Sequence, residues 1–177
     1  MLDFKPQNKH PMIHSKNFGE IEILNPRSTL GISICSNNKA RVNKYVRDTG
    51  NKSHQLRYEL STKDWRNIFF EDFNMSCPIT QLPAPFHEIH LGHFIPIHWG
   101  VGGSFVGNVF PIYGPLNISM RDYNPLDYLE WENPDFPIHP EGVDFLVDYL
   151  ARCNGLTVEE YKDYVNSCYV KYRKGRY

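Results

Sequence analysis

One histidine and two asparagines surround a glycine-rich turn near the middle of this 177-residue chain. His93 comes before the turn, Asn108 follows it, and Asn117 stands further along, while three glycines lie between residues 100 and 103. An imidazole can take a proton from water near neutral pH, because its ordinary pKa is about 6.5. An amide oxygen is a ligand that a hard cation such as Mg²⁺ accepts. These residue types therefore suit metal-assisted hydrolysis, which needs a deprotonated water and a charge that stabilises the leaving oxygen.

The stretch from 93 to 117 resembles the HNH endonuclease motif, in the variant whose last letter is also asparagine. The similarity is local, covering about residues 77–128. Cys77-Pro78-Ile79-Thr80 is similar to the Cys-x-x-Thr segment that precedes the site in phage HNH proteins, and Asn124-Pro125 with Trp131 resembles the exit from the last helix of that motif. The resemblance implies a ββα-metal core, made of two antiparallel strands and a helix around Mg²⁺, with Mn²⁺ as the alternative ion.

The resemblance also assigns roles to single residues. His93 is the general base that activates water, and Asn117 is the metal ligand. Asn108 holds the loop between the strands and so orients His93. Many family members have a metal-binding Asp or His just before the base, where this chain has Gly92. His90 is the nearest candidate for a further ligand, although residues three apart on an ideal strand point to opposite faces, so joint ligation by His90 and His93 would need a bulge.

Two other patterns leave alternatives open. The family often has a phosphate-binding lysine three residues after the last asparagine, but here that place is Met120. Arg121 is next to Met120 and takes this role in our interpretation, although on an ideal helix its side chain points about 100° away from that of Met120.

A zinc site is an alternative interpretation, because imidazole binds zinc. It would use four histidines, namely His87, His90, His93 and His98. No Cys-x-x-Cys pair is present, so we expect no structural zinc.

Hydrophobic patterning predicts the elements that must position these residues. Residues 86–95 and 104–110 are expected to form antiparallel strands, followed by a short helix over residues 115–121 with a proline in its first turn. An amphipathic helix is expected over residues 62–73, with Thr62 as N-cap. Its buried stripe is expected to consist of Trp65, Ile68, Phe69 and Phe73.

The two ends of the chain differ in character. The N-terminal part predicts two short strands within residues 19–36, a basic helix over 38–48 and another strand over 54–60. The C-terminal part predicts a helix over 142–153 and a second helix from a capping box at Thr157 to about residue 172. These two helices are expected to form a hairpin that acts as a lid or as an interaction surface.

Charge is distributed unevenly along the chain. Residues 1–70 contain 12 Lys/Arg and 6 Asp/Glu, whereas residues 71–177 contain 7 and 14. This asymmetry predicts that the N-terminal part meets a polyanion, and lysine and arginine supply most non-specific affinity for DNA. The expected DNA contacts are Lys39, Arg41, Lys44, Arg47 and Arg121, within a wider basic set of Arg27, Lys52, Arg57, Lys63 and Arg66 and with Tyr45 and Tyr58 near sugar or bases.

The sequence therefore predicts an α+β protein with three parts. These are a basic N-terminal α/β extension (1–61), an HNH nuclease core (62–135) and a C-terminal helical hairpin (136–177). We expect a DNA endonuclease of the phage or homing type, located in the cytoplasm of the producing or host cell and without a membrane span. The alternatives are an HNH-type restriction endonuclease and a catalytically silent DNA-binding or packaging accessory protein.

Overall fold

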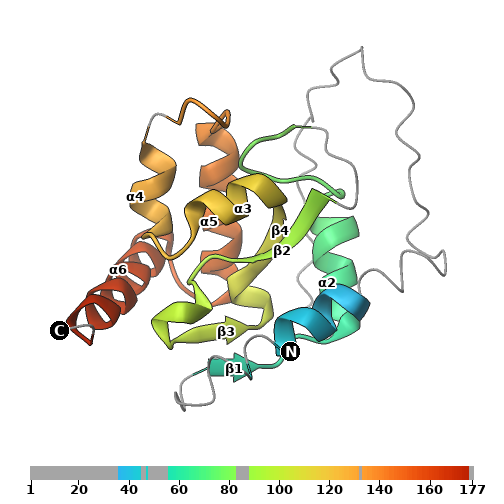
Figure 1. Cartoon of the computed structure of the whole chain (residues 1–177), viewed down its shortest axis with the longest axis horizontal. Coiled ribbons are helices and arrows are strands. Elements are labelled where there is room, and N and C mark those ends of the chain that lie inside the picture. The colour runs from blue at the N-terminus through green and yellow to red at the C-terminus, as the bar shows by residue number, and fades with distance from the viewer. Residues whose placement is uncertain (1–35, 45–46, 48–55, 83–87, 132, 176–177) are drawn as a thin grey trace.

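A computed structural model of the chain describes residues 36–44, 47, 56–82, 88–131 and 133–175. Helices and short strands are mixed in an α+β arrangement (Figure 1). A helix over residues 36–44 comes first, and the next elements are β1 (Leu56–Tyr58), α2 (Thr62–Arg66), the π-helix η1 (Asn67–Asp72), β2 (Ile89–His93) and the 3-10 helix η3 (Ile97–Trp99). The remaining elements are β3 (Gly102–Ser104), the 3-10 helix η4 (Val106–Asn108), β4 (Val109–Tyr113), α3 (Gly114–Met120), α4 (Pro125–Glu130), α5 (Pro140–Cys153) and α6 (Val158–Lys174).

The strands form two separate pairs. β2 and β4 are antiparallel, with Ile89 opposite Tyr113 and His93 opposite Val109, and α3 begins directly after β4. β1 and β3 are parallel. The predicted partner strand over residues 104–110 was therefore wrong in its bounds, because the partner of β2 is β4 and Ser104 belongs to the other pair.

A glycine explains why the segment before β4 leaves the hairpin. Gly103 has a φ of +103°, and a Cβ there would lie 2.3 Å from the carbonyl oxygen of Arg57. Only a residue without a side chain permits this conformation and this approach. β3 can therefore pair closely with β1, and the chain returns to the hairpin only at Val109.

The helix predicted over 62–73 is present as α2 and η1, but its cap differs from the prediction. Ser61, and not Thr62, is the N-cap: its Oγ accepts from the Asp64 N–H at 3.0 Å, and Asp64 Oδ2 accepts from the Ser61 N–H at 2.9 Å. A capping box needs a side-chain acceptor three residues after the cap, and only Ser61 has one there. All four residues of the predicted stripe are buried, namely Trp65, Ile68, Phe69 and Phe73.

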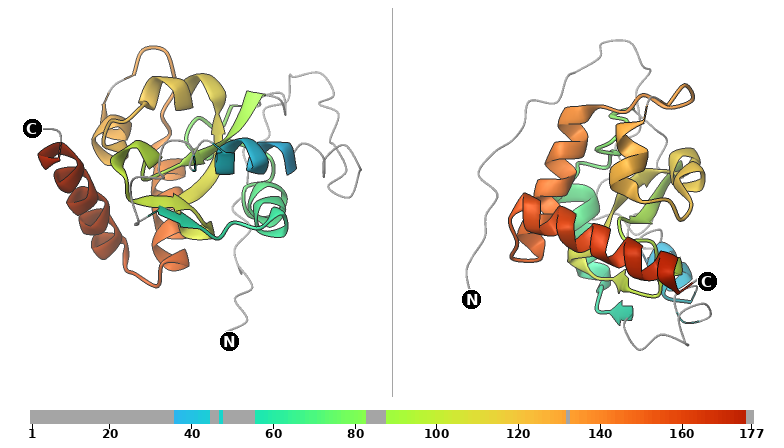
Figure 2. Two further views of the ribbon diagram at one scale, coloured as in Figure 1. Left: turned by 60° about the horizontal axis from the view of Figure 1, so that its bottom comes forward. Right: turned by 90° about the vertical axis from the view of Figure 1, so that its left-hand side faces the viewer.

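The C-terminal hairpin is confirmed in outline. α5 begins at Pro140, slightly earlier than predicted, and α6 has the predicted capping box between Thr157 and Glu160. One hydrophobic core includes residues of both helices and of the strand hairpin. The right-hand view of Figure 2 shows α5 on one side of that hairpin and the helix over 36–44 on the other. The predicted division of the chain into three parts stays a prediction.

The N-terminal predictions are tested only in part. The strands expected within residues 19–36 lie almost wholly outside the described residues. The basic helix is present over residues 36–44, where Val42 packs against the core while Arg41 and Lys44 are exposed. Within the described part of the chain, no helix has the length and apolar character needed to cross a membrane.

Candidate active site

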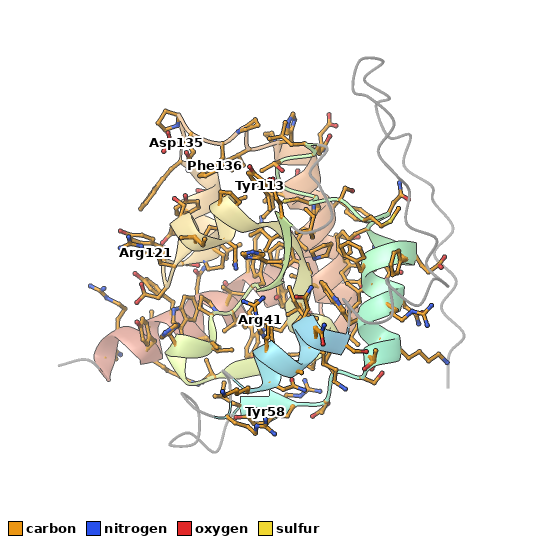
Figure 3. The ribbon with its side chains drawn as sticks, turned by 45° about the vertical axis from the view of Figure 1, so that its right-hand side comes forward. Arg41, Tyr58, Tyr113, Arg121, Asp135 and Phe136 are labelled. Atoms are coloured by element: carbon orange, nitrogen blue, oxygen red, sulfur yellow. The ribbon has the colours of Figure 1, made fainter. Side chains whose placement is uncertain are left out.

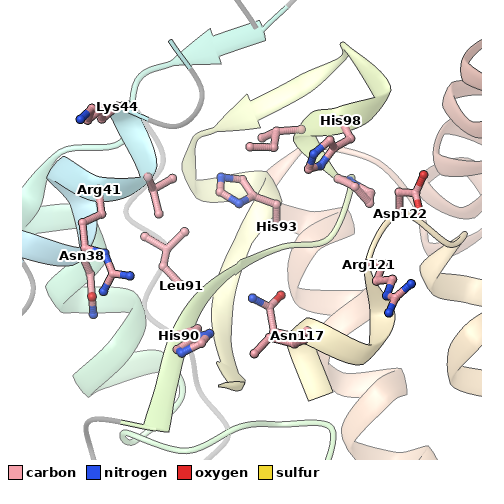
Figure 4. A pocket seen from close by; sticks show the side chains of 14 residues that line it. Asn38, Arg41, Lys44, His90, Leu91, His93, His98, Asn117, Arg121 and Asp122 are labelled. Carbon is pink, nitrogen blue, oxygen red and sulfur yellow. The ribbon is translucent and has the colours of Figure 1, made fainter. Parts of the chain in front are cut away.

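A pocket of about 930 Å³ lies where the end of β2, the helix α3 and the helix over 36–44 meet. Figure 4 shows His93 in the middle of the labelled side chains, with those of the helix over 36–44 on one side and those of α3 and the residues after it on the other. The lining residues that carry polar or charged side chains are Asn38, Arg41, Lys44, His90, His93, His98, Asn117, Arg121 and Asp122. The fold thus brings His93 and Asn117 to the same pocket.

His93 is the last residue of β2 and has one hydrogen-bond partner among the described residues. Its Nε2 lies 2.9 Å from the Oγ of Ser104, which belongs to β3. Burial lowers the pKa of His93 to about 4, because a buried imidazolium loses its hydration. At neutral pH the ring is therefore uncharged and has one nitrogen able to accept a proton.

The lowered pKa of His93 predicts how stability depends on pH. In the unfolded chain His93 takes up a proton near pH 6.5, whereas in the folded chain it does so near pH 4. The free energy of unfolding that depends on His93 is therefore fully present above about pH 6.5 and is lost as the pH falls toward 4, by at most about 3 kcal/mol. We expect urea unfolding in EDTA to show this loss, and a His93→Gln variant to show a shallower decline over the same pH range. Equal slopes for the two proteins would contradict the shift.

Asn108 is completely buried at the end of η4. Its Oδ1 accepts from the Ile95 N–H at 2.7 Å, and its Nδ2 donates to the carbonyls of Ile95 at 3.1 Å and Gly103 at 2.8 Å. One side chain therefore joins the segment after β2 to the segment before Ser104. These bonds are of the kind that the predicted loop-holding role requires, since they connect the backbone on both sides of the His93–Ser104 contact.

Asn117 offers a ligand group to the pocket. Its side chain is partly buried and makes no hydrogen bond to another described residue. Mg²⁺ takes oxygen ligands and keeps several of its waters. One amide oxygen in a pocket open to water therefore fits a largely hydrated Mg²⁺ ion.

The position before His93 cannot contribute a ligand without rearrangement. A Cβ at Gly92 would lie 2.7 Å from the Cγ2 of Ile112 and 3.3 Å from the ring of Phe110. Both neighbours are buried side chains of β4. An aspartate or histidine at position 92 would therefore be directed into the core and not toward the pocket.

His90 lines the pocket from the opposite face of β2. Its ring packs over the backbone of Gly114, where an added Cβ would lie 2.7 Å from His90 Nε2. Burial, and then the charge of Arg41, lower the pKa of His90, so the ring is neutral and able to bind a metal. The pairing of β2 with β4 runs without a bulge from Ile89 to His93. β2 therefore lacks the bulge that His90 and His93 would need in order to bind one ion together.

The histidines do not form a closed metal centre in the described residues. His90, His93 and His98 line the same pocket, while His87 lies outside the described part of the chain. Across the described ranges, no three His, Cys, Asp or Glu side chains gather closely enough to hold an ion. Among the described side chains, the group suited to a hydrated cation is therefore Asn117 and not a cluster of histidines.

Three of the predicted DNA-binding residues reach the pocket. Arg41 and Lys44 line it from the helix over 36–44, and Arg121 lines it from the other side. Figure 3 shows Arg41 and Arg121 on different elements of the molecule, with Tyr58 on β1 below Arg41. Lys39, on the same helix as Arg41, and Arg47 do not line the pocket.

Arg121 reaches the pocket because the helix stops before it. α3 ends at Met120, and Arg121 has a φ of +46°. The angle of about 100° expected from an ideal helix therefore does not apply to this side chain. Met120 is buried in the core and cannot contact phosphate.

Comparison of the chain with family models, with curated proteins and with solved structures finds no match. The residues of the pocket and the resemblance of the motif are therefore the features that point to a function of this chain.

Three polar residues of the site were missed at the level of sequence. Ser104 contacts His93, Asn38 lines the pocket, and Asp122 lines the pocket and accepts a hydrogen bond from the hydroxyl of Tyr172. The signal for Ser104 was a single polar residue between Gly103 and the apolar Phe105. That pattern does not say what the hydroxyl would face, because the contact depends on the pairing of β3 with β1.

Proposed function

We propose that this protein is an Mg²⁺-dependent DNA endonuclease of the HNH type. The observation that carries the proposal is the meeting of His93, Asn117 and Arg41 at one pocket, from three different elements. A proton acceptor, an oxygen ligand and a fixed positive charge are the three groups that phosphodiester hydrolysis requires. The order β2, β4, α3 suits the ββα-metal core that the motif implies.

In the proposed reaction, His93 takes a proton from a water molecule that attacks the phosphorus. Asn117 would hold the metal ion through its amide oxygen, and His90, which lines the same pocket, would supply a second ligand. When bound, Mg²⁺ supplies the positive charge that stabilises the pentacovalent transition state and the leaving 3′ oxygen. Asn108 keeps the segments on both sides of His93 in place, and the product carries a 5′ phosphate.

The helix over 36–44 supplies the charge that binds the DNA backbone in this proposal. Arg41 and Lys44 are exposed at the rim of the pocket, and neither forms an ion pair with another described residue. Arg57 differs, because it forms an ion pair with Glu59 at 2.6 Å and lies over the ring of Phe105. Arg41 and Lys44, beside His93 and without an ion pair to a described residue, are therefore the cations best placed to contact phosphates near the scissile bond.

We expect Arg41→Ala and Lys44→Ala each to weaken DNA binding several-fold and to reduce the slope of log K against log salt by about 1, because each removes one phosphate contact. Fluorescence anisotropy with a labelled duplex, titrated at several salt concentrations in EDTA, measures both quantities. Lys162→Ala is the matched control, since Lys162 is exposed on α6 and does not line the pocket. An equal loss of affinity in the control would show that the basic rim is not the binding surface.

The decisive test is digestion of supercoiled plasmid by the whole chain. We expect nicked or linear DNA with Mg²⁺ or Mn²⁺ and no cleavage in EDTA. Asn117→Ala is expected to reduce cleavage at low Mg²⁺ and to regain part of it at high Mg²⁺, because the ion loses a ligand. Cleavage that persists in EDTA would reject the metal-dependent mechanism.

The same experiment separates the alternatives. DNA binding without cleavage in Mg²⁺, Mn²⁺ and Ni²⁺ would select the accessory protein, which the glycine at position 92 and the buried Met120 favour. Cleavage at one short, frequent sequence would indicate a restriction enzyme. Cleavage at a single long site would indicate the phage or homing type.

A further inference from the structure

We propose that two exposed aromatic rings beside the pocket, those of Tyr123 and Trp131, bind an unpaired base of the DNA next to the scissile phosphate. The substrate class is then DNA that has a single-stranded segment at the cleavage position. That the bound DNA is cleaved rests on the proposed function, whereas the stacking of an unpaired base does not.

The two rings stand at opposite ends of α4 and pack on the same buried ring. Tyr123 comes shortly before this helix and Trp131 directly after it, while Tyr128 belongs to the helix and is buried. The ring centroid of Tyr128 is 6.1 Å from that of Tyr123 and 6.0 Å from that of Trp131. The two exposed rings are 5.9 Å apart, with their planes inclined by 67°. We call these two exposed rings the aromatic surface.

Hydrogen bonds limit the movement of the aromatic surface. The Tyr128 hydroxyl donates to Ser119 Oγ at 2.7 Å, which joins α4 to α3 (Figure 1). The Tyr123 N–H donates to the Met120 carbonyl at 3.1 Å. The Trp131 N–H donates to the Tyr128 carbonyl at 3.3 Å. Because the backbone beneath both rings is held before anything binds, little conformational entropy is lost when a flat ligand stacks on them.

The aromatic surface is open to solvent although its rings are largely apolar. Tyr123 is 47% exposed and Trp131 is 55% exposed. Next to them, Ile118 lines the pocket from α3 and is 66% exposed. Large apolar side chains that are exposed together mark an interaction site, whereas single scattered ones do not.

The charge beside the aromatic surface indicates that its occupant is a nucleotide. Arg121 lines the pocket and is separated from Tyr123 by one residue along the chain. Its side chain is exposed and forms no ion pair with another described residue. A phosphate at Arg121 would therefore bring the adjoining base toward the aromatic surface. Sites for single-stranded nucleic acid combine a cationic groove with aromatic rings on which bases stack in this way.

Only an unpaired base can use the aromatic surface. In a duplex the faces of each base are covered by its neighbours, so a protein ring can stack on a base only after the base has left the duplex. Asp127 and Glu130 are exposed on α4, so this side of the molecule does not attract a duplex by charge. Stacking releases no counterions from the phosphates, so its contribution to affinity is expected to be independent of salt.

The test compares binding of a labelled thymidine oligonucleotide, and of its duplex with the complementary strand, to the whole chain in EDTA. Fluorescence anisotropy gives both affinities. We expect Tyr123→Ala and Trp131→Ala each to weaken single-strand binding by about fivefold or more, because each removes a stacking ring. Duplex binding should change by less than about twofold, and the slope of log K against log salt should stay the same.

Three further variants serve as controls. Tyr123→Phe and Trp131→Phe keep an aromatic ring and should bind the single strand nearly as well as the unmodified protein. Tyr164→Ala is the matched control, because Tyr164 is a tyrosine of similar exposure, 39%, that lies on α6 and does not line the pocket. We expect it to bind the single strand like the unmodified protein.

Tryptophan fluorescence reports the contact directly. The chain has three tryptophans, of which Trp65 and Trp99 are buried and Trp131 is exposed. A stacked base should therefore quench the emission of the unmodified protein, and Trp131→Phe should lose this quenching while it still binds the oligonucleotide. Acrylamide should quench Trp131 in the free protein, because nothing covers the ring before DNA binds.

Single-strand affinity that is unchanged in both alanine variants, or an equal loss in Tyr164→Ala, would overturn the inference. An equal loss of single-strand and duplex binding would also overturn it, since the rings would then act only on local structure. Protection of Trp131 from acrylamide in the free protein would show that another segment or a second copy is the occupant. If the aromatic surface binds the single strand but no metal supports cleavage, the inference stands and the proposed nuclease function fails. Cleavage by a chain whose alanine variants bind normally would give the reverse result.

Discussion

Replacing His93 by alanine is expected to lower the rate of Mg²⁺-dependent DNA cleavage by about 10²- to 10⁴-fold, the usual contribution of a general base. Two properties of the residue suit this role: it lines the pocket, and its ring is neutral at pH 7 because burial lowers its pKa to about 4. The same shift makes the ring a weaker base than a free imidazole, so the expected effect lies at the lower end of this range. Plasmid cleavage measured under single-turnover conditions gives the rate of the chemical step.

His98→Ala is the matched control for this prediction. His98 is a second histidine of the same pocket, but it is exposed and lies in η3, outside the strand hairpin. We expect its replacement to change the rate by less than about tenfold. DNA affinity in EDTA should be nearly the same in both variants, because neutral His93 carries no charge for a phosphate. Undiminished cleavage by His93→Ala would refute its assignment as the base.

The parts of the site that could be predicted from the sequence are those with local signals. The turn between His93 and Asn108, the proline at the start of α3 and the capping box at Thr157 each involve residues close together in the chain. Such signals depend on short-range sterics and hydrogen bonds, so they can be recognised in the sequence before the fold is known. They placed His93 and Asn117 near the end of a strand and in a short helix, which is where the structure has them.

The parts that could not be predicted depend on contacts between distant segments. The register of β4 was missed because Gly103 takes the chain away to pair with β1, at a position that apolar spacing does not reveal. The position of Arg121 at the pocket could not be predicted, because the sequence does not show that α3 ends at Met120. The contact between Ser104 and His93 requires both strand pairs to be in place, and the spacing of the residues gives no sign of the parallel pair of β1 and β3.

Asn108→Ala is expected to have the largest effect on stability, about 3–5 kcal/mol. The substitution removes three hydrogen bonds and leaves the Ile95 N–H, the Ile95 carbonyl and the Gly103 carbonyl without this partner in a fully buried place. Each buried polar group left unpaired costs about 1–3 kcal/mol. Urea unfolding at pH 7 measures the loss.

Two further variants separate the hydrogen bonds of Asn108 from its volume. Asn108→Asp has nearly the same shape and can still accept from Ile95, but its second oxygen would face two carbonyl oxygens, so we expect it to be destabilised as well. Asn133→Ala is the control: that side chain is only partly buried and bonds to the Tyr128 hydroxyl and the Asp135 N–H, and its loss should cost about 1 kcal/mol or less. If Asn108→Asp were as stable as the unmodified protein, the two donated hydrogen bonds would not be what holds the segments around His93.

A preparation of Asn108→Ala that is folded at low temperature should also cleave DNA more slowly than Asn133→Ala. The reason is that Ile95 and Gly103 are then free to shift, and His93 and Ser104 move with them.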